Sequence, residues 1–307
     1  MTQSDYKSPS AEWHDYYKQF PNLSSDAIRD GCHPQIMLQA EPASKAIVLT
    51  HGLRDSPYFM AAIGRYFHTQ LGYDVYLPLL QGHGLKEPAG MEKVSQAVWK
   101  ENVNFAIECA SQRSETVSVG GLSTGGLLSF LMGATDKKIN GAVYLFAAAL
   151  DLKGGGPFDV VGELKEWAMR LSFIDEIADF NKPLISDDPY RYSHVDMDGA
   201  HELGKLIEEG EDYLETLGPD NLYPKPVFAA HWEGDERADI AGIEALQCVA
   251  DPARFEFFRM GKDEKVTHPS LVLDGPIEKN GVVYEEKNPR FDEMMAAVAA
   301  FEKKSGC

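Results

Sequence analysis

The chain has 307 residues, of which 44% are hydrophobic and 25% are charged, an ordinary composition for a globular protein with a substantial core. Its net charge of −19 argues against a nucleic-acid partner, since phosphate backbones are bound by clustered lysine and arginine, and it predicts mild repulsion of anionic substrates. No segment approaches the roughly 20 apolar residues of a membrane span, no secretory pattern opens the chain, and the four scattered cysteines predict free thiols in a reducing cytoplasm.

Apolar, β-branched runs alternate with amphipathic helical patterns along the chain. Strands are expected at residues 45–50, 73–80, 116–120, 141–149, 225–231 and 255–260. Helices are expected at residues 57–72, 94–110, 125–134 and 289–304. An Asn-Gly pair between two β-like runs predicts a hairpin over 277–286. This alternation predicts an α/β fold with a mostly parallel sheet covered by helices on both faces.

One long stretch interrupts this alternation. Residues 151–222 contain no convincing strand, but they carry helical patterns at 160–171 and 201–217. The stretch is too long for a simple connection inside a compact domain. It therefore predicts a helical cap inserted over one end of the sheet, with residues 1–150 and 223–307 forming the core.

The segment Gly121-Leu122-Ser123-Thr124-Gly125 has the G-x-S-x-G pattern and lies between an expected strand and an expected helix. In that context the glycines permit a sharp turn that exposes the serine, so Ser123 is the predicted nucleophile. A purely structural turn is the alternative interpretation. A phosphate-binding loop is disfavoured, because no Lys-Ser or Lys-Thr pair follows the glycines.

A serine nucleophile requires donors that stabilise the oxyanion of the tetrahedral intermediate. The expected donors are the backbone N–H of Thr124, which follows the nucleophile, and that of Leu53, in the loop after an early strand. His51 lies in the same loop. Its expected role is to shape the loop by packing and hydrogen bonding rather than to act as the base.

The base is expected on a loop after the last strand of the sheet, because the chain order for this motif is serine, acid, histidine. His268 is the histidine that follows the last clear strand. His83, between two glycines, and His231, near a strand end, are its rivals. The first is typical of a shaped turn and the second of a buried core histidine, so His268 is preferred.

The acid is expected just after the strand at 225–231, where Asp235 stands on a loop that begins with glycine. Asp239, Glu233 and Asp263 lie close enough in sequence to compete. The role of the acid is to orient His268 and to stabilise its protonated form.

Five motifs carry a family resemblance in order along residues 44–270: "LTHGL", "GYDVYLPLLQGHG", "GLSTGG", "WEGDER" and "THPS". With them the chain resembles the α/β-hydrolases, and it is similar to bacterial carboxylesterases and monoacylglycerol lipases that carry a cap. The resemblance implies an α/β-hydrolase fold and a serine esterase acting on small acyl esters or monoacylglycerols. It implies no cofactor and no metal, and a structural role for His83.

The chain departs from the family pattern at three places. Trp232 stands where the acid loop usually has glycine, residues 271–288 form an extra hairpin-like insert, and the cap sequence matches only weakly. Acyltransferases, serine peptidases and carbon–carbon hydrolases can use the same triad, and a catalytically silent binding protein can keep the fold. Dehalogenases and epoxide hydrolases are disfavoured, because their nucleophile is a carboxylate.

Overall fold

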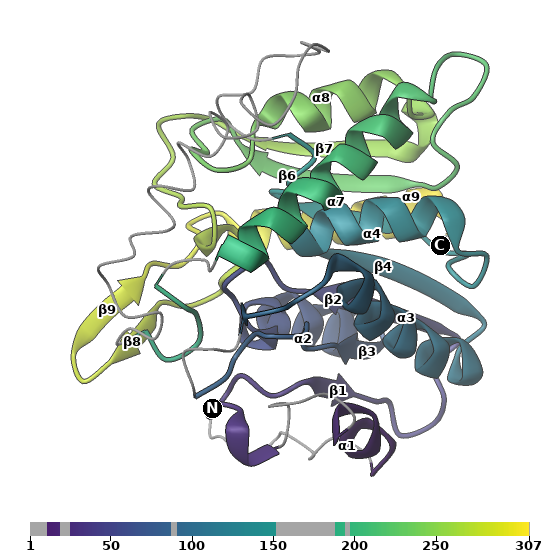
Figure 1. Cartoon of the computed structure of the whole chain (residues 1–307). Helices are drawn as coiled ribbons and strands as arrows, with labels where there is room; N and C mark the ends of the chain where they lie inside the picture. Colours follow the sequence, from purple (N-terminus) through teal and green to yellow (C-terminus); the bar gives the residue numbers. More distant parts are fainter. Residues whose placement is uncertain (1–10, 19–24, 87–90, 152–187, 194–196, 307) are drawn as a thin grey trace.

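The computed structural model describes residues 11–18, 25–86, 91–151, 188–193 and 197–306 (Figure 1). A seven-stranded sheet lies at its centre. The strands are β1 (Gln35–Met37), β2 (Lys45–Thr50), β3 (Asp74–Leu77), β4 (Thr116–Leu122), β5 (Val143–Phe146), β6 (Val227–Trp232) and β7 (Phe255–Met260). Their spatial order is β1-β3-β2-β4-β5-β6-β7.

Strands β2 to β7 pair in parallel, and β1 pairs antiparallel with β3 at the edge of the sheet. The parallel strands correspond to the six that the apolar runs predict, so the predicted α/β fold is confirmed. The edge strand β1 was not predicted. Its three residues are too few to show the period-two alternation that marks a strand.

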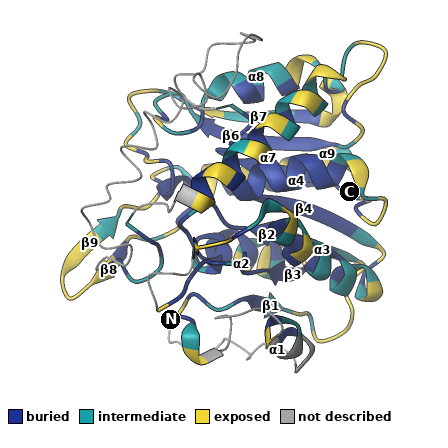
Figure 2. Ribbon diagram, in the orientation of Figure 1, coloured by how far each residue is buried: buried dark blue, intermediate teal, exposed yellow. Residues whose placement is uncertain are grey.

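Helices cover both faces of this sheet. They are α1 (Ala11–Lys18), α2 (Ala61–Gln70), α3 (Gln96–Arg113), α4 (Thr124–Thr135), α7 (Met197–Glu215), α8 (Ile240–Cys248) and α9 (Phe291–Ser305). Helices α3, α4, α7 and α8 contribute to one apolar cluster, and α2 and α9 contribute to another. Figure 2 shows that β2 to β6 and helix α4, which packs on one face of the sheet, are almost entirely buried.

Successive side chains of β2 alternate between these two clusters. Ala46 and Val48 belong to the cluster beneath α3 and α4, whereas Ile47 and Leu49 belong to the cluster beneath α2 and α9. Because side chains of a strand point alternately to opposite faces, a strand buried on both faces is apolar at every position. This explains the unbroken apolar run in the sequence.

A buried carboxylate attaches α9 to the sheet. Glu302 is 6% exposed and accepts hydrogen bonds from the hydroxyls of Tyr73 and Tyr144. Its other neighbour is the ammonium group of Lys45, 3.4 Å away at the start of β2. Burial raises the pKa of Glu302, and the Tyr73 hydroxyl and Lys45 counteract part of that rise. The polar groups of this face are thus satisfied by one another.

Helix α7 lies in the stretch that was predicted to form a cap, and it crosses α4 in Figure 1. The two helices approach closely at Gly210, where an added Cβ would lie 2.7 Å from Leu127 Cδ1. Tyr213 packs against Phe130 one turn further along. Residues 152–187 lie outside the described residues, so the cap stays a prediction. Within the described ranges, no helix combines the length and apolarity needed to cross a membrane.

The predicted hairpin is present as β8 (Ile277–Lys279) and β9 (Val282–Glu285). The Asn280-Gly281 turn has φ values of 55° and 78°. Both lie in the left-handed region that a tight two-residue hairpin turn requires, and Asn and Gly adopt it at least cost.

Candidate active site

Ser123 occupies a sharp turn between β4 and α4. It has φ 54° and ψ −115°, a conformation that a residue with a Cβ adopts only under strain. The turn is fixed by its backbone, because the Ser123 N–H donates to the Phe146 carbonyl at 3.0 Å and the Ser123 carbonyl accepts from Leu127 and Ala149. The side chain remains partly exposed. Strain at a partly exposed serine is typical of a nucleophile elbow.

The glycines on either side of Ser123 let β2 approach this turn. A Cβ on Gly121 would lie 2.4 Å from the Thr50 carbonyl oxygen, and a Cβ on Gly125 would lie 2.1 Å from it. Both contacts are with rigid backbone, so any side chain at these positions would push β2 and the elbow apart. The glycines are therefore required by packing, and the serine between them is not.

The loop after β2 lies against the elbow. A Cβ on Gly52 would be 3.3 Å from Ser123 Cβ, so the backbone of this loop adjoins the serine directly. Leu53 follows in a half-buried position, and Thr124 is the first residue of α4. The N–H groups of a helix's first turn have no acceptor inside the helix. The two predicted oxyanion donors thus belong to the two backbone segments that flank Ser123.

His51 holds this loop in place. It is fully buried, its Nδ1 lies 2.9 Å from the Gly52 carbonyl oxygen, and its Nε2 accepts the Leu80 N–H at 3.2 Å. An acceptor at Nε2 and a carbonyl at Nδ1 require a neutral ring with its proton on Nδ1. Burial lowers the pKa of His51 to about 4. The ring therefore has the loop-shaping contacts that the sequence predicts.

The structure brings His268 and Asp235 together. His268 Nδ1 lies 2.7 Å from Asp235 Oδ2, and both side chains are nearly buried. The other carboxylate oxygen of Asp235 accepts the N–H groups of Arg237 at 2.8 Å and Ala238 at 3.2 Å. Burial raises the pKa of Asp235, but the charge and hydrogen bond of His268 lower it further, to about 2. Asp235 is therefore a carboxylate at neutral pH, oriented toward the histidine.

The competing acids have other partners. Asp239 caps α8 by accepting the Ala241 N–H, and Glu233 pairs with Arg259 on the surface. Asp263 is exposed. Of the four carboxylates considered, Asp235 is the one whose oxygen meets the His268 ring.

The competing histidines are buried. His231 is 0% exposed, its Nε2 lies 3.1 Å from the Ala238 carbonyl oxygen, and that same nitrogen is 3.8 Å from Asp235 Oδ2. Burial lowers the pKa of His231. His83 is also 0% exposed, with Nδ1 3.0 Å from the Gln81 carbonyl oxygen, and burial followed by the neighbouring His51 lowers its pKa to about 3. These contacts suit the structural roles predicted for both.

The buried pair His51 and His83 makes acid lability an expected property. Their pKa values of about 4 and about 3 lie below the ordinary 6.5, so the unfolded chain binds protons at a higher pH than the folded chain does. The contribution of these two histidines to the free energy of unfolding is fully present above pH 6.5. It should fall as the pH drops toward 4, by up to about 1.4 kcal/mol per pH unit for each histidine. Urea unfolding between pH 7 and pH 5 measures this slope. His83→Gln should reduce it by one histidine's share, and an unchanged slope in that variant would contradict the assignment.

Trp232, the departure from the family pattern, fits without displacing Asp235. Its indole N–H donates to the Gly261 carbonyl at 2.9 Å. Its ring packs so closely on Gly234 that a Cβ on this glycine would lie 2.2 Å from a ring carbon. The tryptophan therefore fills the space above a glycine and ties the acid loop to the end of β7.

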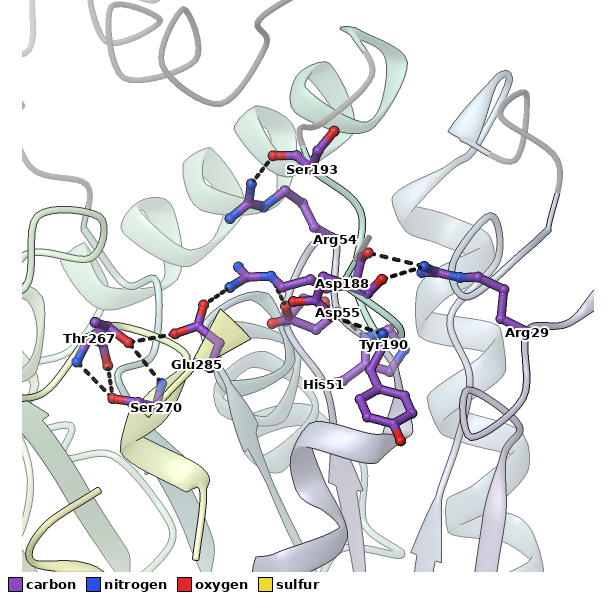
Figure 3. Close-up of polar contacts among 12 residues, drawn as sticks. Arg29, His51, Arg54, Asp55, Asp188, Tyr190, Ser193, Thr267, Ser270 and Glu285 are labelled. Atoms are coloured by element: carbon purple, nitrogen blue, oxygen red, sulfur yellow. Dashed lines mark hydrogen bonds and ion pairs between the residues drawn. The ribbon is translucent and has the colours of Figure 1, made fainter. Parts of the chain in front are cut away.

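Sequence reasoning missed a set of charged side chains beside this site. Arg191, 6% exposed, approaches Asp55 Oδ1 at 3.3 Å with its Nε and pairs with Glu285 of β9. Glu285 also accepts the hydroxyl of Thr267 at 3.0 Å, next to His268 in the chain (Figure 3). The partners come from four distant segments, so no local motif announces them. Glu285 belongs to the predicted hairpin, but the turn signal that predicts a hairpin does not indicate what its side chains contact.

The described residues hold no group of three or more His, Cys, Asp or Glu side chains that could bind a metal ion. Cys32, Cys109 and Cys248 form no disulfide with one another.

Comparisons with known proteins agree with this architecture. A family described as serine aminopeptidase, S33, matches residues 41–192. A thermostable monoacylglycerol lipase from Bacillus sp. (strain H-257) is 31% identical over 145 residues, which are 45% of this chain and 54% of the lipase. The chain thus spans about half the length of this curated relative.

Solved structures match over nearly the whole chain. A structure of the metagenome-derived lipolytic enzymes LipS and LipT gives a TM-score of 0.64 at 17% identity, covering 90% of this chain and 99% of that one. A monoacylglycerol lipase from Paleococcus ferrophilus gives 0.59 at 17% identity, covering 89% and 98%. Its sheet order, its elbow and these matches show that the chain has the α/β-hydrolase fold.

Proposed function

We propose that this protein is a serine hydrolase that cleaves carboxylic esters through Ser123, His268 and Asp235. The observation that carries the proposal is the 2.7 Å contact between His268 and Asp235 on the same sheet edge as the strained Ser123 turn. Ser123 follows β4, Asp235 follows β6 and His268 follows β7. Parallel strands bring their carboxyl ends to one edge, where α/β proteins place their sites.

The first half of the reaction transfers the acyl group to the enzyme. Ser123 Oγ attacks the ester carbonyl carbon while His268 Nε2 takes the hydroxyl proton, since Nδ1 is engaged by Asp235. The N–H groups of Leu53 and Thr124 stabilise the tetrahedral oxyanion. When the intermediate collapses, the ester C–O bond breaks and His268 returns the proton to the departing alcohol.

The second half releases the acid. His268 removes a proton from water, and the hydroxide attacks the acyl carbon bound to Ser123. The second tetrahedral intermediate expels Ser123 Oγ, which regains its proton from His268. The products are one alcohol and one carboxylic acid, and no cofactor takes part.

Small acyl esters and monoacylglycerols are the proposed substrates. Support comes from the monoacylglycerol lipase and carboxylesterase activities named for the sequence relatives. The predicted cap, residues 151–222, would cover the site and contact the acyl chain. In its favour, the Tyr192 N–H donates to the Arg54 carbonyl at 2.8 Å, so the returning end of this stretch meets the loop beside Ser123.

A fluorophosphonate probe and an ester panel test the proposal. The probe should label Ser123 of the wild type, and para-nitrophenyl esters from acetate to palmitate should be hydrolysed. Because the matching family is described as a serine aminopeptidase, aminoacyl para-nitroanilides form a second panel. Faster turnover of the anilides than of the esters would replace the proposed esterase activity by a peptidase activity. A wild type that is neither labelled by the probe nor active on either panel would contradict the proposed serine hydrolase activity.

A further inference from the structure

Five charged side chains gather beside the elbow, and we call them the arginine cluster: Arg54, Asp55, Arg191, Arg237 and Glu285. Arg54, Asp55 and Arg191 are 7%, 2% and 6% exposed, so most of the cluster lies out of water. They come from the loop after β2, from residues 188–193, from the loop after β6 and from β9. Figure 3 shows Arg54 above Asp55, with Glu285 beside them.

Both carboxylates of the cluster form ion pairs with the same arginine. Arg191 contacts Asp55 at 3.3 Å and pairs with Glu285. Arg54 donates instead to the carbonyl oxygen of Ser193, a neutral acceptor. Over the described ranges, neither Arg54 nor Arg237 forms an ion pair. Three guanidinium groups thus share the two carboxylates of the cluster, and the carboxylate of Asp235, which also acts on Arg237, is engaged by His268.

A buried cation that forms no direct ion pair is costly. Burial, and then the nearby Arg191 and Arg237, lower the pKa of Arg54 well below its ordinary value, and Asp55 and Glu285 offset only part of that fall. Arg237 responds in the same way, through burial and then Arg191. Like charges held together in a low-dielectric site are stabilised when an anion binds between them.

The cluster adjoins the predicted catalytic groups. Arg54 follows Leu53, and a Cβ on Gly52 would lie 2.6 Å from Asp55 Oδ2 and 3.3 Å from Ser123 Cβ, so Asp55 and Ser123 flank this glycine. Arg237 is two residues from Asp235, and the backbone N–H of Arg237 donates to that carboxylate at 2.8 Å. In the sheet, β4 and β5 lie between β2 and β6. The loops that carry Arg54 and Arg237 therefore lie on either side of β4, the strand that leads into Ser123.

We infer that Arg54 and Arg237 form an anion subsite that binds a carboxylate group on the ester substrate. This inference rests on the proposed ester hydrolysis and narrows its substrate class to negatively charged esters. Guanidinium groups pair with carboxylates through two parallel hydrogen bonds, which fixes orientation as well as affinity. A carboxylate is planar like the guanidinium group and carries one charge, whereas a phosphate monoester is tetrahedral and carries close to two.

The test compares two substrates that differ at one end. Para-nitrophenyl hemiadipate ends in a carboxylate, and para-nitrophenyl hexanoate ends in a methyl group at the same position. With uncatalysed rates subtracted, the wild type should have the higher kcat/KM for the hemiadipate. Arg237→Gln and Arg54→Gln should each lower the hemiadipate-to-hexanoate ratio by about 10- to 100-fold, the effect of one charge-assisted contact.

The matched control is Arg259→Gln. Arg259 is an exposed arginine of β7 paired with Glu233 and Glu244, and its removal should leave the ratio unchanged. Arg54→Lys keeps the charge but loses the planar fork, so its ratio should fall between those of wild type and Arg54→Gln. If buried Arg54 variants fail to fold, the wild-type ratio and the less buried Arg237 still decide the question.

Two results would overturn the inference and leave the esterase proposal standing. The first is equal kcat/KM for both esters in the wild type. The second is an unchanged hemiadipate-to-hexanoate ratio in the Arg54 and Arg237 variants while Ser123-dependent hydrolysis continues. Free adipate should also inhibit hexanoate hydrolysis more strongly than inorganic phosphate at the same concentration, and the reverse order would exclude a carboxylate subsite. Failure to hydrolyse either ester, with no probe labelling, would instead remove the proposed function.

Discussion

Ser123→Ala is expected to lower kcat for ester hydrolysis by about 10⁴- to 10⁶-fold, because the variant retains the oxyanion donors but lacks the attacking oxygen. The fold should be kept, since alanine and serine both carry a Cβ at the strained φ of 54°. The measurement is kcat on a short para-nitrophenyl ester, with circular dichroism and thermal unfolding to verify the fold.

Ser123→Gly is the companion variant. It is equally inactive in this mechanism, but glycine adopts the left-handed region without strain, so it should unfold at a higher temperature than Ser123→Ala. Wild-type turnover by a folded, pure Ser123→Ala preparation would refute the nucleophile assignment.

Asp235→Asn is expected to lower kcat by roughly 10⁴-fold. An amide can donate to His268 Nδ1, which favours the ring tautomer with its proton on Nε2, and that nitrogen then cannot accept the serine proton. The neutral amide also cannot stabilise the positively charged ring of His268 as the carboxylate does. Steady-state kinetics on one ester would measure the loss.

Asp239→Asn is the matched control, a substitution of the same kind four residues away. Asp239 caps α8 through the Ala241 N–H, and asparagine caps a helix about as well, so both kcat and stability should stay close to wild type. If Asp239→Asn produced the larger loss, the acid would be Asp239 and the rest of the mechanism would stand.

Sequence patterns predicted the parts of the fold in which one local signal decides the outcome. The strand β2 is apolar at each of its inner positions because it is buried on both faces, and such a run is visible without a structure. The G-x-S-x-G segment carries its own turn geometry, so Ser123 could be placed from five residues. The Asn280-Gly281 turn is a third example.

Features made by distant partners escaped prediction. Asp235 was preferred over Asp239 only from its place in the loop, because the contact that distinguishes them is with His268, 33 residues further along the chain. Arg191 meets Glu285 across 94 residues, and nothing in either neighbourhood indicates the other. Helix α8 was also missed, because its nine residues show too little contrast between faces.

The carboxylate of Glu302 has a consequence for the order in which this protein folds. Its partners Tyr144, Tyr73 and Lys45 precede it by 158, 229 and 257 residues. During synthesis these groups leave the ribosome long before α9 exists, and their face of the sheet stays uncovered until that helix docks. Because contacts of such long separation form late, docking of α9 is the expected slow phase of refolding. In nascent chains that lack α9, the sheet therefore forms only transiently. The uncovered apolar face makes these chains the species most prone to aggregation.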